Sequence, residues 1–116
     1  MFWLEARKVR RGKTGHFRAF GSSMEPVIPS GSYLTIEPVD VEQLELGDIV
    51  VVKVGDETMV HLVKTIDRAA RRVEISGTSG PASGWTTFEH IYGICTRIGD
   101  KAVPGAEAKA RRPRAS

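Results

Sequence analysis

The sequence predicts one small all-β domain, built mainly from antiparallel strands. Its 116 residues, 41% of them apolar, suffice for one compact domain and are too few for two ordinary ones. Twelve glycines and six prolines interrupt the chain every few positions, which disfavours long helices. Between these interruptions apolar and polar side chains repeatedly alternate, which is the period of a half-buried strand.

Short turns join the expected strands, as in an antiparallel meander. Gly55 and Asp56 form a hairpin-compatible pair, and the polar residues 67–71 separate the next two strands. Residues 39–46 link two strands and can make one helical turn before Gly47. The expected strands cover residues 16–20, 32–37, 48–54, 57–66, 72–76 and 90–98.

Charge gathers at the two ends of the chain. Residues 99–116 contain five basic and two acidic side chains, which accounts for the whole net charge of +3. From Lys101 onward there is too little apolar surface to offset the entropy of ordering, so we expect a disordered basic tail over residues 100–116. Residues 1–14 hold a second basic cluster, which we expect to be a solvated, partly disordered terminus. The folded domain is then expected to span residues 15–99.

The neutral body of the chain disfavours nucleic acid as a partner. The basic N-terminal segment leaves peripheral contact with an anionic membrane as one option. No stretch approaches the ~20 apolar residues of a membrane span. The apolar run at the N-terminus ends at Leu4, which is too short for the core of a signal peptide. We therefore expect a cytoplasmic protein, with a membrane-peripheral location as the alternative.

Cysteine and histidine usage predicts neither a disulfide nor a cofactor. Cys95 is the single cysteine and lies in an apolar strand, so we interpret it as a small core residue. The histidines, His16, His61 and His90, are dispersed and lack the paired spacing of metal ligands. We expect no metal site.

The most informative segment is Phe-Gly-Ser-Ser-Met-Glu-Pro, which begins at Phe20. A strand runs into a glycine, presents Ser22 and Ser23, and leaves through a turn stiffened by proline. Such a loop can hold a hydroxyl at the mouth of a cleft, beside backbone N–H groups. Gly-Ser-Ser also occurs in ordinary turns, so the residues alone leave both interpretations open.

Four segments resemble, in order and spacing, the boxes of the signal peptidase I and SOS-repressor peptidase superfamily, over roughly residues 17–98. In that superfamily the serine before methionine is the nucleophile. The base is a lysine in bacterial signal peptidases and repressors, and a histidine in archaeal and endoplasmic-reticulum signal peptidases. The resemblance implies a β-fold of this type, with Ser23 as nucleophile and His61 as general base. The segments are Ser23-Met24-Glu25-Pro26, Gly31-Ser32, residues 46–50 and Met59-Val60-His61.

The chemistry of these two residues is consistent with the resemblance, because neutral imidazole can accept a serine proton near pH 7. Strand alternation places Lys64 on the face opposite to His61, and Lys53 belongs to another strand. We expect the oxyanion to be bound by the backbone N–H of Ser23, with help from the Ser22 hydroxyl.

The chain departs from the resembling enzymes at three positions. Gly21 stands where they often have a serine, and Leu62 follows the base where they often have an arginine. No acid follows Ser76 until Glu89, so Thr78 or Ser79 is the candidate to orient the imidazole. Three apolar side chains after the nucleophile either line a shallow cleft for a peptide or pack in the core; they are Met24, Val27 and Ile28.

The sequence thus favours a serine endopeptidase that cleaves a protein or leader peptide through an acyl-enzyme on Ser23. The alternative is a catalytically degenerate peptide-binding or assembly module of the same fold, in which Ser23 and His61 lie out of reach or the cleft is filled. Self-cleavage of the repressor kind is disfavoured, because only 22 residues precede Ser23. The resemblance to dimerising repressor domains leaves a homodimer open.

Overall fold

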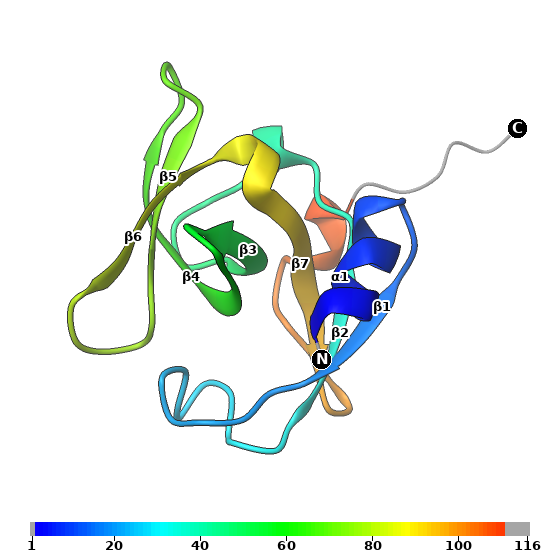
Figure 1. Ribbon diagram of the computed structural model, residues 1–116. Helices are drawn as coiled ribbons and strands as arrows, with labels where there is room; N and C mark the ends of the chain where they lie inside the picture. The colour runs from blue at the N-terminus through cyan, green and yellow to red at the C-terminus, as the bar shows by residue number, and fades with distance from the viewer. Residues whose placement is uncertain (1, 111–116) are drawn as a thin grey trace, which may run out of the picture.

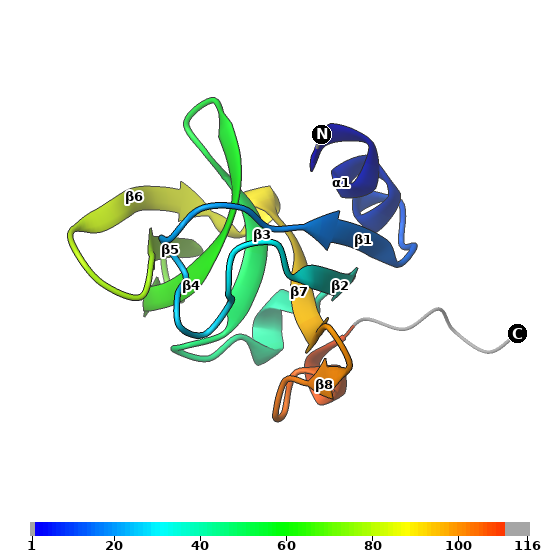
Figure 2. The same cartoon turned by 90° about the horizontal axis from the view of Figure 1, so that it is seen from below.

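The structure, a computed structural model, describes the backbone of residues 2–110 and the side chains of residues 5–110. One curled antiparallel sheet has the strand order β1-β2-β7-β3-β4-β5-β6, with β8 added beside β7 (Figures 1 and 2). This confirms the predicted all-β fold. In chain order the elements are α1 (Phe2–Arg10), β1 (Gly15–Arg18), β2 (Tyr33–Glu37), the 3₁₀ turn η1 (Val41–Gln43), β3 (Ile49–Val54), β4 (Glu57–Asp67), β5 (Arg72–Ser76), β6 (Ala82–Thr87), η2 (Phe88–His90), β7 (Ile91–Ile98), β8 (Lys101–Ala102) and η3 (Glu107–Lys109).

Strand β3 lies at the centre of the hydrophobic core and is buried on both faces. Ile49 and Val51 belong to one apolar cluster, whereas Val50 and Val52 belong to a second cluster on the other face. A strand covered on both faces has a continuous apolar run instead of an alternating one, as here. Cys95 lies fully buried in the first cluster, where desolvation raises the pKa of its thiol to about 12. Its predicted core position is confirmed.

The N-terminal segment differs from the solvated terminus that we expected, because residues 2–10 form α1, which packs against the sheet (Figure 1). Ala6 and Val9 are three residues apart, so they lie on one face of the helix, and both are buried in the first cluster. The basic side chains Arg7, Lys8 and Arg11 are exposed. Among the described side chains of α1, these two apolar residues anchor the helix in the core.

The C-terminal segment is also more ordered than its composition suggested, which corrects our expectation for residues 100–110. β8 pairs with β7, and Ala106 is 2% exposed in the second cluster. Lys109 Nζ lies 2.7 Å from Asp48 Oδ1 and 2.8 Å from Glu45 Oε1. Strand pairing, a buried alanine and an ion-pair cluster thus hold this segment on the sheet. Residues 111–116, the rest of the expected disordered tail, lie outside the described residues.

Strand β6 was not among the expected strands, because Ala-Ser-Gly-Trp-Thr-Thr lacks a regular apolar alternation. It pairs with β5 and forms one edge of the sheet. Ile75 lies opposite Gly84 and Ser76 lies opposite Ala82, so Ser83 is the extra residue of a β-bulge. Tertiary pairing with β5 overrides the weak local signal.

No helix in the described part of the chain combines the length and the apolar character needed to cross a bilayer.

Candidate active site

The loop between β1 and β2 carries Ser23 and runs across the sheet towards β4 and β5 (Figures 1 and 2). The Ala19 N–H donates to Ser32 O over 2.9 Å, and the Gly31 N–H donates to Ala19 O over 2.6 Å. Both hydrogen bonds close the base of the loop. Within it, Met24 and Ile28 are buried in the first apolar cluster. The loop is therefore held by backbone pairing at its base and by apolar anchors near Ser23.

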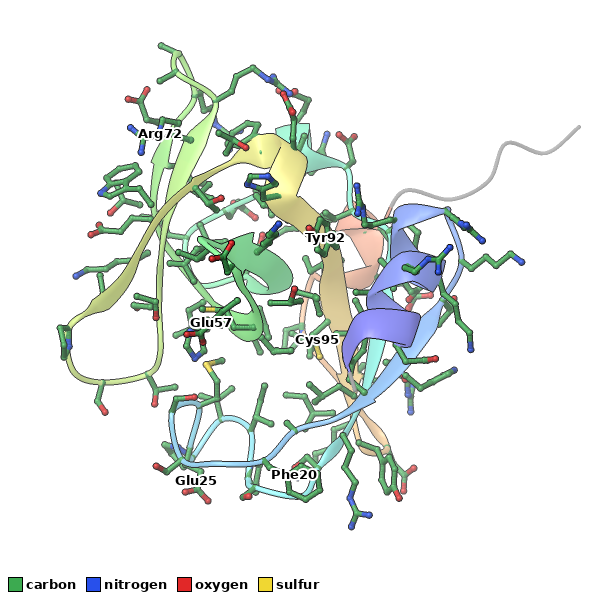
Figure 3. All side chains as sticks on the ribbon, viewed as in Figure 1. Phe20, Glu25, Glu57, Arg72, Tyr92 and Cys95 are labelled. Carbon is green, nitrogen blue, oxygen red and sulfur yellow. The ribbon has the colours of Figure 1, made fainter. Side chains whose placement is uncertain are left out.

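A second contact fixes the Ser23 backbone from the segment that follows β5. The Thr78 N–H donates to Ser23 O over 2.9 Å, and the Thr78 hydroxyl donates to Glu25 O over 2.6 Å. Gly77 makes this approach possible, because a Cβ atom at that position would overlap the Ser23 carbonyl oxygen. Figure 3 shows Glu25 extending from the loop away from the sheet.

Ser23 and His61, which the sequence paired as nucleophile and base, lie within hydrogen-bond distance of each other. Ser23 Oγ is 3.1 Å from His61 Nε2, although 38 residues separate the two in the chain. His61 lies in β4, opposite Val50 of β3, and is half-buried. Burial lowers the pKa of the imidazole below its ordinary value of 6.5, so the ring is neutral at pH 7 and can accept a proton.

The other ring nitrogen of His61 contacts a residue that the sequence did not single out. Ser83 Oγ lies 3.0 Å from His61 Nδ1. The expectation was Thr78 or Ser79; instead the Thr78 hydroxyl donates to the carbonyl oxygens of the Ser23 loop, and Ser79 is exposed in the bend before β6. A glycine inside a strand is a sign of a bulge, so Gly84 is the sequence signal that points towards Ser83.

A pocket of about 150 Å³ opens beside the two residues. Met24 and Ile28 line it and also belong to the core, so the two interpretations left open for them both apply. Val27 differs from the expectation, because it is 46% exposed and lies outside the pocket lining. The lining residues are Ala19, Phe20, Gly21, Ser23, Met24, Ile28, Thr58, Met59, Val60 and His61.

Two donors were expected for an oxyanion, the Ser23 N–H and the Ser22 hydroxyl. Within residues 2–110 the Ser23 N–H donates to no protein acceptor, so it is available to a ligand. Ser22 is exposed, and its carbonyl oxygen accepts the Glu25 N–H over 3.1 Å.

Neither candidate lysine lines the Ser23 pocket. Lys64 is the extra residue of a bulge between Val63 and Thr65 and lines a separate hollow beside residues 44–46. Lys53 lies in β3, opposite Thr58. Within the described part of the chain, no three His, Cys, Asp or Glu side chains gather where they could hold a metal ion.

Comparison with known proteins places these residues in a family. The model of the Peptidase S24-like family matches residues 1–76 of the 116. The match includes Ser23 and His61 and ends before Ser83. No curated protein and no solved structure matches the chain. Because the family match covers more than half of the sequence, the chain belongs to the Peptidase S24-like family.

Proposed function

We propose that the protein is a serine endopeptidase that cleaves a protein or peptide through an acyl-enzyme on Ser23, with His61 as general base. The observation that carries the proposal is the 3.1 Å contact between Ser23 Oγ and His61 Nε2. A serine hydroxyl becomes a good nucleophile when an adjacent base accepts its proton. Membership of a peptidase family supports the same reaction class.

The reaction follows from this geometry. Ser23 Oγ attacks the peptide carbonyl carbon while its proton passes to His61 Nε2, and the Ser23 N–H stabilises the oxyanion. The intermediate collapses with cleavage of the C–N bond, and His61 returns the proton to the leaving amine. Water then attacks the acyl ester and gives a proton to His61. The Ser23 oxygen regains a proton as the carboxylic acid product leaves.

The strand pairing favours an extended peptide as the substrate. Residues 57–62 of β4 pair with β3, whereas pairing with β5 begins only at Leu62. Residues 58–60 therefore have a strand neighbour on one side, and they line the Ser23 pocket on the other. An extended chain can pair with such a free edge and place alternate side chains in the pocket. A volume of about 150 Å³ can hold one medium-sized apolar side chain.

The degenerate binding module is the weaker alternative. It predicts that Ser23 and His61 lie apart or that internal side chains fill the cleft. The short Ser23–His61 contact and the open pocket beside it both favour the enzyme.

Covalent labelling tests the proposal. The purified chain is treated with a fluorophosphonate and read by intact mass, in parallel with cleavage of a fluorogenic peptide library. The variants are Ser23→Ala and His61→Ala, with Ser79→Ala and His16→Ala as matched controls outside the site. We expect labelling and cleavage by the wild type and both controls, and neither by the two site variants.

Two results would contradict the proposal. Cleavage that persists in Ser23→Ala would show a contaminating peptidase or a different nucleophile. A wild-type protein that binds library peptides but neither labels nor cleaves them would favour the binding module.

A further inference from the structure

Ser83 reaches the imidazole because of a local irregularity in β6. The bulge inserts Ser83 between the Ser76–Ala82 and Ile75–Gly84 pairs. Gly84, the next residue, has φ of +139°, a conformation that side-chain-bearing residues rarely adopt. Bulges often redirect a side chain next to an active site. Here the bulge accompanies the 3.0 Å approach of Ser83 Oγ to His61 Nδ1.

We propose that Ser83 is the positioning residue of His61, so that Ser23, His61 and Ser83 form an uncharged hydrogen-bonded triad. The inference rests on the proposed peptidase function and deepens it, because it assigns the third member of the site. The family match ends at Ser76 and does not include Ser83.

The direction of the two hydrogen bonds follows from the chemistry of a general base. To accept the Ser23 proton, Nε2 of His61 must carry a lone pair, so the ring proton must be on Nδ1. Nδ1–H then donates to Ser83 Oγ, which can accept because a hydroxyl has two lone pairs. Ser83 thereby holds the rotation of the ring and accepts the Nδ1 proton of the tautomer that can act as a base.

Within the described part of the chain, no carboxylate belongs to this hydrogen-bonded triad. The residues that line the pocket carry no charge other than that of a protonated His61, and β6 has no ionisable residue. Of the acids on the packed elements, Glu25 accepts the Ser30 N–H over 3.5 Å and Glu74 accepts the Thr65 hydroxyl over 3.0 Å. The remaining charged residues of these elements, Lys53, Glu57, Lys64, Asp67 and Arg72, lie outside the pocket lining.

An uncharged third member has two consequences. The imidazolium that forms during acyl transfer lacks a carboxylate partner, so the chemical step is slower than in a triad whose third member is Asp or Glu. The second consequence is that His61 stays neutral down to a lower pH, because no negative charge stabilises its protonated form.

The test combines kinetics with nitrogen-15 NMR of the His61 ring in the full chain. The variants are Ser83→Ala, which removes the acceptor, Ser83→Thr, which keeps the hydroxyl, and Ser83→Asp, which adds a charge. Ser79→Ala is the matched control. We expect Ser83→Ala to lower kcat about 10- to 100-fold with little change in KM, and Ser83→Thr to retain most of kcat. Ser79→Ala should match the wild type.

The NMR signals report the ring directly, whether or not a substrate is cleaved. We expect the wild-type Nδ1 signal to be that of a hydrogen-bonded nitrogen, and Ser83→Ala to shift this signal and the balance of the two tautomers. Ser83→Asp should raise the pKa of His61 by about one pH unit or more. A Ser83→Ala protein with the wild-type tautomer, pKa and kcat would overturn the inference while leaving the peptidase intact. If Ser83→Ala shifts the tautomer in a protein that cleaves nothing, the positioning contact stands and the proposed function fails.

Discussion

The carbonyl oxygen of Ser23 accepts a hydrogen bond of 2.9 Å from the backbone N–H of Thr78, 55 residues later in the chain. This bond joins the loop that carries the candidate nucleophile to the segment between β5 and β6. The same segment leads into β6 and Ser83. Both contacts to the Ser23–His61 pair, from Thr78 and from Ser83, therefore come from one stretch of chain that follows the family match.

Substitution Gly77→Ala should displace the Ser23 loop, because the new Cβ would overlap the Ser23 carbonyl oxygen, which is backbone and cannot rotate away. A shift of about 1 Å at a reacting atom can cost roughly 100-fold in rate. We expect a fall in kcat of about that size in a chain that remains folded, measured by peptide cleavage and circular dichroism. Ser79→Ala, in the same segment, is the control. A Gly77→Ala enzyme with wild-type kcat would show that the close approach of Gly77 does not position the Ser23 loop.

The pH dependence of kcat/KM should follow the protonation of His61. Burial lowers the pKa of His61 below 6.5, and catalysis needs the unprotonated ring, so activity should be lost only as the pH falls through that lowered pKa. The acid limb is therefore expected below pH 6.5. His16→Gln should leave the profile unchanged. An acid limb at or above pH 6.5 would contradict the assignment of a half-buried base without a carboxylate partner.

Met59 should limit the size of the side chain that enters the Ser23 pocket. The pocket measures about 150 Å³, and Met59 lines it from β4. We expect the wild type to prefer Leu over Trp next to the scissile bond, and Met59→Ala to raise kcat/KM for Trp relative to Leu. Matched peptides that differ in this residue measure the ratio. An unchanged ratio would place the specificity pocket elsewhere.

Lys109 should contribute to stability through the cluster that it forms with Asp48 and Glu45. The side chains of Lys109 and Asp48 are 13% and 11% exposed, so Lys109→Met leaves a nearly buried carboxylate without its cation. Removal of one partner from a fully buried pair costs about 3–5 kcal/mol. Because Glu45 is exposed, we expect a loss of about 2 kcal/mol in the free energy of unfolding, measured by urea denaturation. Lys101→Met is the exposed control, and an equal loss there would contradict this role.

The strands and the candidate Ser23–His61 pair could be predicted from the sequence. Alternating apolar residues report burial on one face of a strand, and this signal is local, so six strands were expected close to their observed positions. The Ser-Met-Glu-Pro and Val-His segments resemble known boxes of peptidases. This resemblance predicted Ser23 as the nucleophile and His61 as the base.

The tertiary structure decided the features that depend on distant contacts. Helix α1 packs on the sheet through Ala6 and Val9, and the contacts of residues 101–110 include the ion pair of Lys109 with Asp48. Ser83 lies in a strand that lacks regular alternation and contacts His61 from a bulge. Composition and periodicity describe a segment by its own residues, whereas these contacts depend on which segments the fold brings together. The sequence by itself thus determined six of the strands and two candidate residues, whereas only the fold decided how the strands are ordered and what holds the two residues in place.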